Sequence, residues 1–369
     1  MYRFNKCISK LRLASGFRYT AIYLCLLSPS VYADSCIGNC KNGQGTLLMS
    51  SGDEYAGEFK DGEMNGQGTL TYANGDHYTG EFKDNLPDGQ GEIIYQDGGR
   101  YKGAWKNGSK NGLGVETNAN GDRYTGALSD NFANGPGVLT YSNGDRYEGE
   151  FINGDKRQGV EIFANGDRYE GEFNDNLPNG QGIGNYANGD RYEGGFLNGD
   201  KHGQGVETFA NGDRYKGEFS NNLPNGQGIG RYANGNVYEG GFLNGNKHGQ
   251  GIETFANGDR YSGEFMDDFP NGQGIVVYAN GGYYEGSFTN GVKHGHGFEA
   301  FVNGDQYEGE FMNNLPNGQG IGLYANGDRY EGGWKDGKRE GQGVFTAARP
   351  EWPVDYPQIG IWKDDMMVR

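Results

Sequence analysis

Apolar and polar positions alternate along most of the chain with a period of two. In YEGEF, residues Tyr169, Gly171 and Phe173 fall on one face of an extended strand, and the two glutamates between them fall on the other. The segment from Gly180 to Tyr186 has the same period. The pattern therefore predicts two strands in each unit, with one face of glycine and aromatic residues and one polar face.

This two-strand unit recurs thirteen times. Its first tyrosine returns every 23 residues, apart from one interval of 22 between Tyr147 and Tyr169. The missing residue falls in INGDKRQG, where other units read LNGDKHGQG, and we expect it to lie in a loop. Alternate units are more alike than neighbours, so the longer period is 46 residues. Tandem units of this length predict a repeat protein in which each unit contacts its neighbours.

Each unit opens with Tyr-x-Gly-x-Phe, or with Trp in place of Phe. Glycine is costly inside a strand and commonly marks a close approach, so we expect an aromatic ring to lie on each bare glycine. Every unit keeps the Tyr and the first Gly, and only Leu128 replaces the Phe or Trp. Representative structural signature residues are Tyr55, Gly57, Phe59, Tyr78, Gly80, Phe82, Tyr101, Gly103, Trp105, Tyr169, Gly171, Phe173, Tyr192, Gly194, Phe196, Tyr330, Gly332 and Trp334.

Two kinds of connection are expected between the strands. Ala-Asn-Gly-Asp, as at Ala187 to Asp190, predicts a tight hairpin turn because Asn and Gly both accept positive φ. The other connection is expected to be a loop, either NLPNG or a segment with a Lys-His pair. We interpret these pairs as solvated loop residues, and alternatively as a weak candidate binding edge for an anionic partner. The pairs are Lys201 with His202, Lys247 with His248, and Lys293 with His294.

The pattern Y-x-G-x-[FW]-x-x-G-x-x-x-G-x-G, followed by an aromatic residue and Asn-Gly-Asp, resembles the MORN repeat (membrane occupation and recognition nexus). The resemblance covers Cys36 to Gly343 nearly without interruption. It implies an all-β fold, an elongated single-layer twisted antiparallel sheet of tandem 23-residue hairpins. With two strands in each unit, thirteen units would span roughly 125 Å. The chain departs from the family in using Phe where Trp is common and in its strong acidity.

The N-terminal segment 1–33 has the layout of a cleavable signal peptide. Five basic residues and no acid precede the apolar run AIYLCLL, and Val31-Tyr32-Ala33 fits a signal-peptidase site before Asp34. The run is too short for a spanning helix, and an uncleaved anchor is the alternative. Cleavage leaves 27 basic against 49 acidic residues, a net charge of −22. We therefore expect an exported protein, periplasmic or extracellular, that binds no nucleic acid and disfavours anionic lipid.

Both ends of the repeat array need protection from edge pairing. Residues 34–54 are interpreted as an N-terminal half-repeat or cap, 55–345 as the array and 346–369 as a C-terminal cap. In the latter, Pro350, Pro353 and Pro357 cannot donate to a ladder, and Trp352 and Trp362 can cover the last strand.

The mature chain keeps two cysteines, Cys36 and Cys40. In an oxidising compartment they are a candidate disulfide. The alternative is a lipidated Cys36, for which Ala33-Asp34-Ser35 is a poor match. Two thiols without a nearby histidine do not predict a metal site.

The sequence predicts neither an enzyme nor a cofactor site. It shows no nucleophile elbow, phosphate loop or paired zinc motif, and turn chemistry accounts for the repeated Asn-Gly-Asp without calcium. Three functions remain: a scaffold that binds a protein partner or itself, a module for glycan or envelope material, and phospholipid binding. We favour the scaffold, because the family is associated with protein assembly and the acidic charge weighs against anionic lipids.

Overall fold

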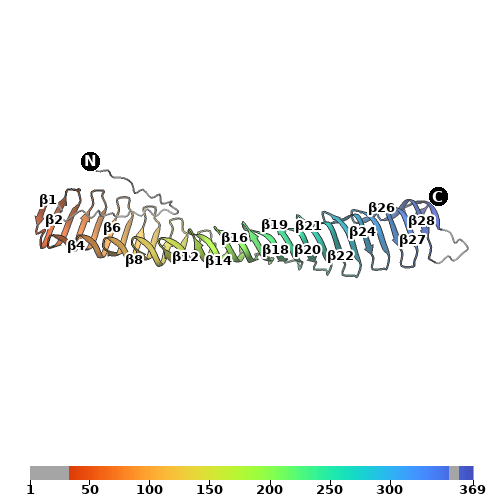
Figure 1. Cartoon of the computed structure of the whole chain (residues 1–369), viewed down its shortest axis with the longest axis horizontal. Coiled ribbons are helices and arrows are strands. Elements are labelled where there is room, and N and C mark those ends of the chain that lie inside the picture. The colour runs from red at the N-terminus through yellow and green to blue at the C-terminus, as the bar shows by residue number, and fades with distance from the viewer. Residues whose placement is uncertain (1–32, 349–356, 369) are drawn as a thin grey trace, which may run out of the picture. The chain divides into compact units, whose positions relative to one another are not determined.

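The computed structural model describes residues 33–348 and 357–368. These residues form an all-β fold of antiparallel hairpins, and strands β1–β30 belong to one open sheet of 30 strands (Figure 1). The fold-class prediction is confirmed at this level. Residues 1–32 of the predicted signal peptide, Pro350, Trp352 and Pro353 lie outside the described residues.

The chain divides into two compact units, residues up to 187 with 196–199, and residues 188–195 with 200 onward. The strand β15 (Arg191–Leu197) contributes residues to both. The first unit contains β1 (Ala33–Gly38), β2 (Gly43–Met49), β3 (Glu54–Lys60), β4 (Glu63–Thr71), β5 (His77–Lys83), β6 (Leu86–Ile94), β7 (Arg100–Lys106), β8 (Ser109–Thr117), β9 (Arg123–Ser129), β10 (Phe132–Thr140), β11 (Arg146–Ile152), β12 (Asp155–Ile162), β13 (Arg168–Asn174) and β14 (Leu177–Asn185).

The second unit continues the same alternation of strands. It contains β16 (Asp200–Thr208), β17 (Arg214–Ser220), β18 (Leu223–Arg231), β19 (Val237–Leu243), β20 (Asn246–Thr254), β21 (Arg260–Met266), β22 (Phe269–Val277), β23 (Tyr283–Thr289), β24 (Val292–Ala300), β25 (Gln306–Met312), β26 (Leu315–Leu323), β27 (Arg329–Lys335), β28 (Lys338–Thr346), β29 (Gln358–Lys363) and β30 (Met366–Met367). The odd-numbered strands β3–β27 are called tyrosine strands below, and the even-numbered strands β4–β28 glycine strands.

The core is a single row of aromatic rings on one face of the sheet. Tyr55 makes edge-to-face contacts with Phe59 of its own strand, at 5.1 Å between centroids, and with Phe82 of the next repeat, at 4.9 Å. The signature tyrosines are buried throughout the described array. Because each ring contacts its own repeat and the next, one repeat alone cannot complete its core.

Glycine pairs make room for the tyrosine rings. Gly217 of β17 lies opposite Gly228 of β18, and the Tyr215 ring covers both. A Cβ on Gly228 would lie 2.3–2.5 Å from atoms of that ring. The Tyr215 hydroxyl then donates a hydrogen bond of 3.0 Å to the Glu218 carbonyl. The ring therefore lies on bare backbone, as the sequence predicted.

The turns differ from the prediction at one point. The tight two-residue turns with both residues at positive φ lead from tyrosine strands to glycine strands, as at Asn244 (φ 50°) and Gly245 (φ 91°). In the Ala-Asn-Gly-Asp loops only the glycine has positive φ, as in Gly258, whose amide donates to the Phe255 carbonyl. The expectation that both residues of those Asn-Gly pairs adopt positive φ is wrong, because the loop closes over five residues from the aromatic to the Asp.

The segments NLPNG and Lys-His-Gly are largely strand and not loop. Leu223 to Gly226 belongs to β18, and Lys201 to Gly203 belongs to β16. Strand β18 contains a β-bulge at the positive-φ Gly226, and β20, which carries Lys247 and His248, contains the equivalent bulge at the positive-φ Gly249. The one-residue deletion likewise falls in strand β12, at the bulge, so the expectation of a loop is wrong there too. A bulge tolerates the loss because its extra residue is unpaired.

Both ends of the described array are hairpins that continue the sheet. At the C-terminal end, β29 pairs with β28 and β30 pairs with β29. Trp362 of β29 is buried and packs edge-to-face on Tyr330 at 5.3 Å, in the place that Phe or Trp occupies in the other repeats. At the N-terminal end, β1 pairs with β2.

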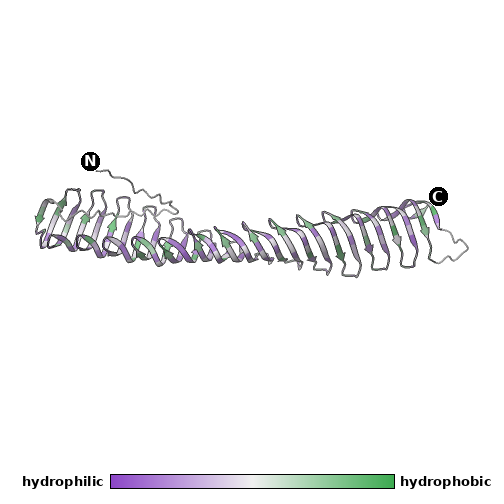
Figure 2. Ribbon diagram, in the orientation of Figure 1, coloured by the Kyte–Doolittle hydropathy of each residue, from purple (hydrophilic) through white to green (hydrophobic). Residues whose placement is uncertain are grey.

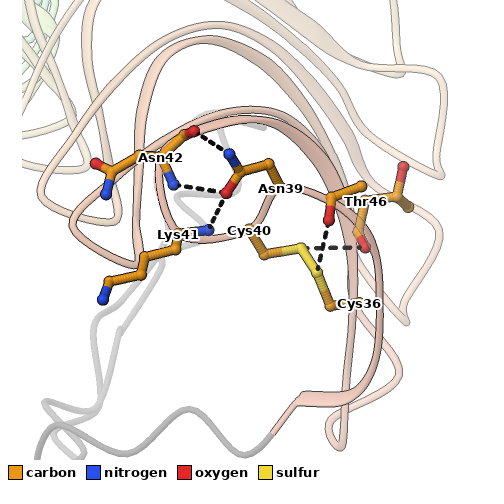
Figure 3. Close-up of a disulfide and its surroundings, with 7 residues drawn as sticks. Cys36, Asn39, Cys40, Lys41, Asn42 and Thr46 are labelled. Carbon is orange, nitrogen blue, oxygen red and sulfur yellow. Dashed lines mark hydrogen bonds between the residues drawn. A yellow bond between two sulfur atoms is a disulfide. The ribbon is translucent and has the colours of Figure 1, made fainter.

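The disulfide between Cys36 and Cys40 lies in this first hairpin (Figure 3). CIGNC repeats the spacing of Tyr-x-Gly-x-Phe, with Gly38 opposite Gly45 as Gly57 is opposite Gly68. The two sulfur atoms thus stand where the next repeat has Tyr55 and Phe59. The side chain of Asn39 closes the adjoining loop by accepting hydrogen bonds from the amides of Lys41 and Asn42.

Candidate functional site

The Lys-His pairs lie in glycine strands, and their lysines point toward the aromatic row. The ammonium group of Lys247 is 2.7 Å from a Glu253 carboxylate oxygen, and both side chains are largely buried. It also lies 5.5–5.8 Å from the ring centroids of Tyr232, Tyr238 and Phe265. The lysine is therefore held in an aromatic box with a carboxylate partner.

The same arrangement recurs at the 46-residue period. The described pairs are Lys110 with Glu116, Lys156 with Glu161, Lys201 with Glu207, Lys247 with Glu253 and Lys293 with Glu299. Burial lowers the pKa of Lys156 and raises that of Glu207, and the partner charge opposes the shift in each case. These lysines are part of the interior and do not form a solvated edge.

The histidines beside them do not gather into a site. His202 and His294 are exposed and His248 is half-buried, each in a different glycine strand. The described residues hold no group of three or more His, Cys, Asp or Glu side chains that fits a metal ion. The predicted binding edge therefore has histidines that lie apart from one another, and its lysines are not exposed to an anionic partner.

The aspartates of the Asn-Gly-Asp loops bind the next repeat. One carboxylate oxygen of Asp213 accepts from the amide of Ala233, 20 residues ahead, at 2.7 Å. The backbone amide of Asp213 donates to the side-chain oxygen of Asn211. The side-chain amide of Asn211 in turn donates to the second carboxylate oxygen of Asp213. This ladder repeats along most loops and gives the aspartates a structural role without an ion.

The sheet face opposite the aromatic row is the surface that the fold leaves open, and we call it the open face. In each repeat it carries the residues between the signature positions. Across β17 to β21 one cross-strand row reads Lys216, Ile229, Glu239, Ile252 and Ser262. Apolar and polar residues thus alternate across these neighbouring strands, and Figure 2 shows hydrophilic and hydrophobic segments mixed along the ribbon.

An aliphatic or aromatic residue recurs in the glycine strands on this face. Ile229 and Ile252 are half-buried, and Ile275 has 39% of its surface exposed. From β8 onward the row comprises Val115, Val138, Val160 and Ile183 in the first unit, and Val206, Ile229, Ile252, Ile275, Phe298, Ile321 and Val344 in the second. This face was predicted to be mostly polar, although the period-two alternation of the sequence already places these apolar residues on it.

The open face is hollowed within the second unit. A depression of about 640 Å³ extends over β16 to β21, and its polar lining includes Gln204, Gln227 and Gln250. Ile229 and Ile252 supply apolar lining, and Glu218, Glu239 and Lys216 supply charge. This size is typical of a site that holds a small ligand or a few side chains of a partner.

Part of the charge on this face is already paired. Arg146, Arg168, Arg191 and Arg329 each bind the glutamate two residues ahead, at 2.6–2.7 Å. Other glutamates close the bulges, as where Glu218 accepts from the amide of Gln227 at 3.2 Å. Glu239 is exposed and has no such partner among the described residues, so it is available to a ligand.

Comparisons with known proteins identify the repeat. The MORN repeat profile matches thirteen consecutive segments: residues 55–77, 78–100, 101–123, 124–146, 147–168, 169–191, 192–214, 215–237, 238–260, 261–283, 284–306, 307–329 and 330–348. No curated protein sequence matches the chain significantly. The described residues contain no helix long and apolar enough to cross a membrane.

Three solved structures that match the chain are distantly similar to it. The TCP domain of SAS-4 from Drosophila melanogaster, solved with a proline-rich motif of Ana2, is 15% identical with a TM-score of 0.24, and the match covers 48% of this chain and 85% of that one. The wild-type TCP10 domain of Danio rerio CPAP is 9% identical with a TM-score of 0.17, over 66% and 97%. A streptogramin B lyase is 14% identical with a TM-score of 0.13, over 74% and 88%.

Similarity of this degree carries no argument about function. The repeat profile, in contrast, accounts for most of the described array, and its members are generally non-catalytic modules for protein or membrane interaction. The chain belongs to the MORN repeat family.

Proposed function

We propose that the chain is an exported, non-catalytic scaffold whose open face binds a partner protein. The observation that supports this proposal most is that only one of the two faces of the sheet is covered by the protein's own side chains. The aromatic face is filled by its own tyrosines and phenylalanines, whereas the open face keeps a row of half-exposed aliphatic residues and a hollow. An apolar row rimmed by polar groups is typical of protein interaction surfaces.

The charge of this face favours a basic partner. Glu239 and Glu218 line the hollow beside a single cation, Lys216, and the mature chain has a predicted net charge of −22. Two copies packed open face to open face would bring glutamate rows together at a cost in free energy. We therefore expect a heterologous partner segment with basic and aliphatic side chains, and we place self-association second.

Phospholipid binding finds less support. Anionic headgroups would meet the same carboxylates, and basic clusters are the usual recognition element for such lipids. A glycan-binding module would use exposed aromatic rings to stack on sugars, but the signature rings are buried. A sugar would have to use another part of the surface.

Two features of the chain support a partner outside the cytoplasm. The segment 1–33 has the sequence features of a signal peptide, and a disulfide joins Cys36 to Cys40 in the first hairpin. Disulfides persist in oxidising compartments. We accordingly propose that the partner is periplasmic or extracellular.

A peptide library displayed on phage tests the proposal with the mature chain as bait. We expect selected peptides to be basic and aliphatic, and to lose binding by at least tenfold with Ile229→Glu/Ile252→Glu. Val302→Glu, which alters a loop residue that is 67% exposed and away from the hollow, is the matched control. Selected peptides that bind the double variant as tightly as the wild type would contradict the proposal.

A further inference from the structure

A patch of apolar side chains lies on the open face of β22, β23 and β24, within the second unit (Figure 1). Ile275, Val277 and Tyr283 are exposed, and Phe298 is half-buried. Val277 pairs with Tyr283 across the strands, and Ile275 and Phe298 both pair with Glu285, so the four share one face. We call these four residues the β22–β24 patch. Apolar groups gathered on an exposed surface are typical of interaction sites.

The two rings of the patch are departures from the repeat. Tyr283 stands where β27 has Arg329, and Phe298 stands where β26 has Ile321. The ring centroids of Tyr283 and Phe298 are 5.6 Å apart, with the planes tilted by 41°, and 38% of the Tyr283 surface is exposed. Both rings lie on the face opposite the aromatic row, so they are not part of the core that holds the repeats together.

The charge around these rings is negative. Glu285 and Glu308 are the cross-strand partners of Phe298 on its two sides. Both glutamates are exposed, and neither has an ion-pair partner within the described part of the chain. Two strand spacings put about 10 Å between their Cα atoms, with Phe298 between them. Surface carboxylates alone do not make a site, but here they set the charge of a partner that covers the rings.

The other repeats show which cation fits beside such a glutamate. In four tyrosine strands an arginine precedes the glutamate by two residues, and in all four the guanidinium binds the carboxylate, as Arg329 binds Glu331 at 2.6 Å. In β23, Tyr283 replaces that arginine in front of Glu285, and β25 has a glutamine at the same position. These two strands keep the carboxylate of the pair, and they offer rings where the arginine would lie.

This combination selects the chemistry of the partner. A guanidinium group has a flat face that stacks on an aromatic ring and N–H edges that bind a carboxylate. An ammonium group would pair with the carboxylates but has no flat face for the rings, and a neutral sugar would leave both charges uncompensated. We propose that the β22–β24 patch binds an arginine side chain of a partner protein, with aliphatic neighbours of that arginine on Ile275 and Val277. This inference rests on the proposed function in taking the open face as the partner-binding surface.

Saturation-transfer NMR on the mature chain tests the proposal. The probe is the peptide acetyl-Gly-Leu-Arg-Leu-Gly-amide. Two matched peptides carry lysine or citrulline, the uncharged analogue of arginine, in its place, and methyl glucoside is the sugar comparison. We expect transfer to the arginine peptide, at least threefold weaker binding of the lysine peptide and at least tenfold weaker binding of the citrulline peptide.

Two variants restore the residue types of other repeats and should therefore fold, as judged by the thermal midpoint. Tyr283→Arg supplies Glu285 with an internal guanidinium, and Phe298→Ile removes a ring without changing the charge. Each should weaken binding of the arginine peptide at least fivefold. Thr289→Arg is the charge-matched control, because it adds the same charge to the same face of β23 about 20 Å from Tyr283. It should leave the binding unchanged.

Ile229→Glu/Ile252→Glu separates this inference from the proposed function. Binding of the arginine peptide that is lost in this variant, but kept in Tyr283→Arg and Phe298→Ile, would place the arginine in the hollow over β16 to β21 and overturn the site. Phage-selected peptides that ignore the hollow would contradict the proposed function but not this site. Equal binding of the citrulline peptide, or preferential binding of methyl glucoside, would also overturn the inference.

Discussion

At the scale of single residues, the structure depends on the contact between a tyrosine ring and two glycines. The ring of Tyr215 lies on Gly217 and Gly228 from neighbouring strands, and its hydroxyl reaches a backbone carbonyl. No larger residue fits at either glycine without moving the ring or the backbone. The regular spacing of Tyr and Gly in the sequence was sufficient to predict this contact.

Two substitutions in β18 separate packing from glycine content. Gly228→Ala should destabilise the protein by about 1–3 kcal/mol, because the new methyl group would overlap the Tyr215 ring. Gly230→Ala is the control: its methyl group would meet only the Tyr232 hydroxyl end, at 3.0 Å, and the equivalent position in β22 is Val276. Thermal denaturation measures both. Equal losses would contradict the proposed role of the Tyr215 ring.

Buried tyrosines also set the response to alkaline pH. Burial raises the pKa of Tyr55 and of Tyr147 from 10.0 to about 12. Because the folded pKa lies above the unfolded value, the stabilisation is fully present below pH 10 and is lost as the pH rises from 10 through about 12. We expect tyrosinate absorbance at 295 nm to appear together with loss of the β-sheet circular dichroism. Ionisation of most tyrosines near pH 10 in a folded chain would contradict their burial.

At the scale of elements, the 46-residue period follows from two kinds of junction between repeats. Pro224 has no amide hydrogen, and its carbonyl accepts from Gly245 of the next turn at 2.9 Å. Lys293 has a backbone amide hydrogen, which it donates to the side-chain oxygen of Asn314 at 2.8 Å. The backbone amide of Asn314 in turn donates to the Lys293 carbonyl. A lysine junction thus needs a turn residue whose side chain accepts a hydrogen bond. A proline junction has no amide to satisfy, so a glycine can stand at that turn position.

The buried ion pair belongs to the lysine junction and should behave as a unit. Lys247→Met should destabilise the protein by about 3–5 kcal/mol, because it leaves the Glu253 carboxylate buried without its partner. Lys247→Met/Glu253→Leu should recover much of that loss, since neither charge then remains in the aromatic box. Urea denaturation of the two variants and the wild type gives the comparison. A double variant as unstable as the single one would show that the pair acts through packing alone.

The lysine junctions could not be predicted from the sequence, for two physical reasons. Lys-His-Gly contains polar residues and a glycine, so it was interpreted as a loop, but a β-bulge accepts the same composition within a strand. The burial of Lys247 depends on Glu253 six residues later in the same strand and on rings from neighbouring repeats. That coincidence becomes visible only when the strand pairing is known.

At the scale of the whole molecule, both ends of the array keep part of the repeat signature found in its interior. CIGNC and QIGIW keep the central glycine and the four-residue spacing of Tyr-x-Gly-x-Phe while losing the tyrosine. The first was predicted as a candidate disulfide and the second as part of a cap. The first lies in residues 34–54, which were predicted to be a half-repeat or cap, although the match of CIGNC to the signature was not predicted. The second was not predicted to be a half-repeat, because Gln358 replaces its tyrosine, although the glycine and the spacing were sufficient to find it.

The proposed export predicts the N-terminus of the mature chain. Expression of the full chain in a secreting host should yield a protein whose N-terminal sequence begins at Asp34, with Cys36 and Cys40 in one disulfide. Intact mass before and after reduction and alkylation measures both properties. A mature chain that retains 1–33, or a lipid-modified Cys36, would contradict this part of the account.

The central claim is that the aromatic face maintains the fold and that the open face binds a partner. Fluorescence anisotropy of a labelled peptide selected on the mature chain tests it most directly. Ile229→Glu/Ile252→Glu should weaken binding at least tenfold without lowering the thermal midpoint by more than a few degrees, while Val302→Glu leaves the affinity unchanged. Unchanged affinity in the folded double variant would contradict the claim.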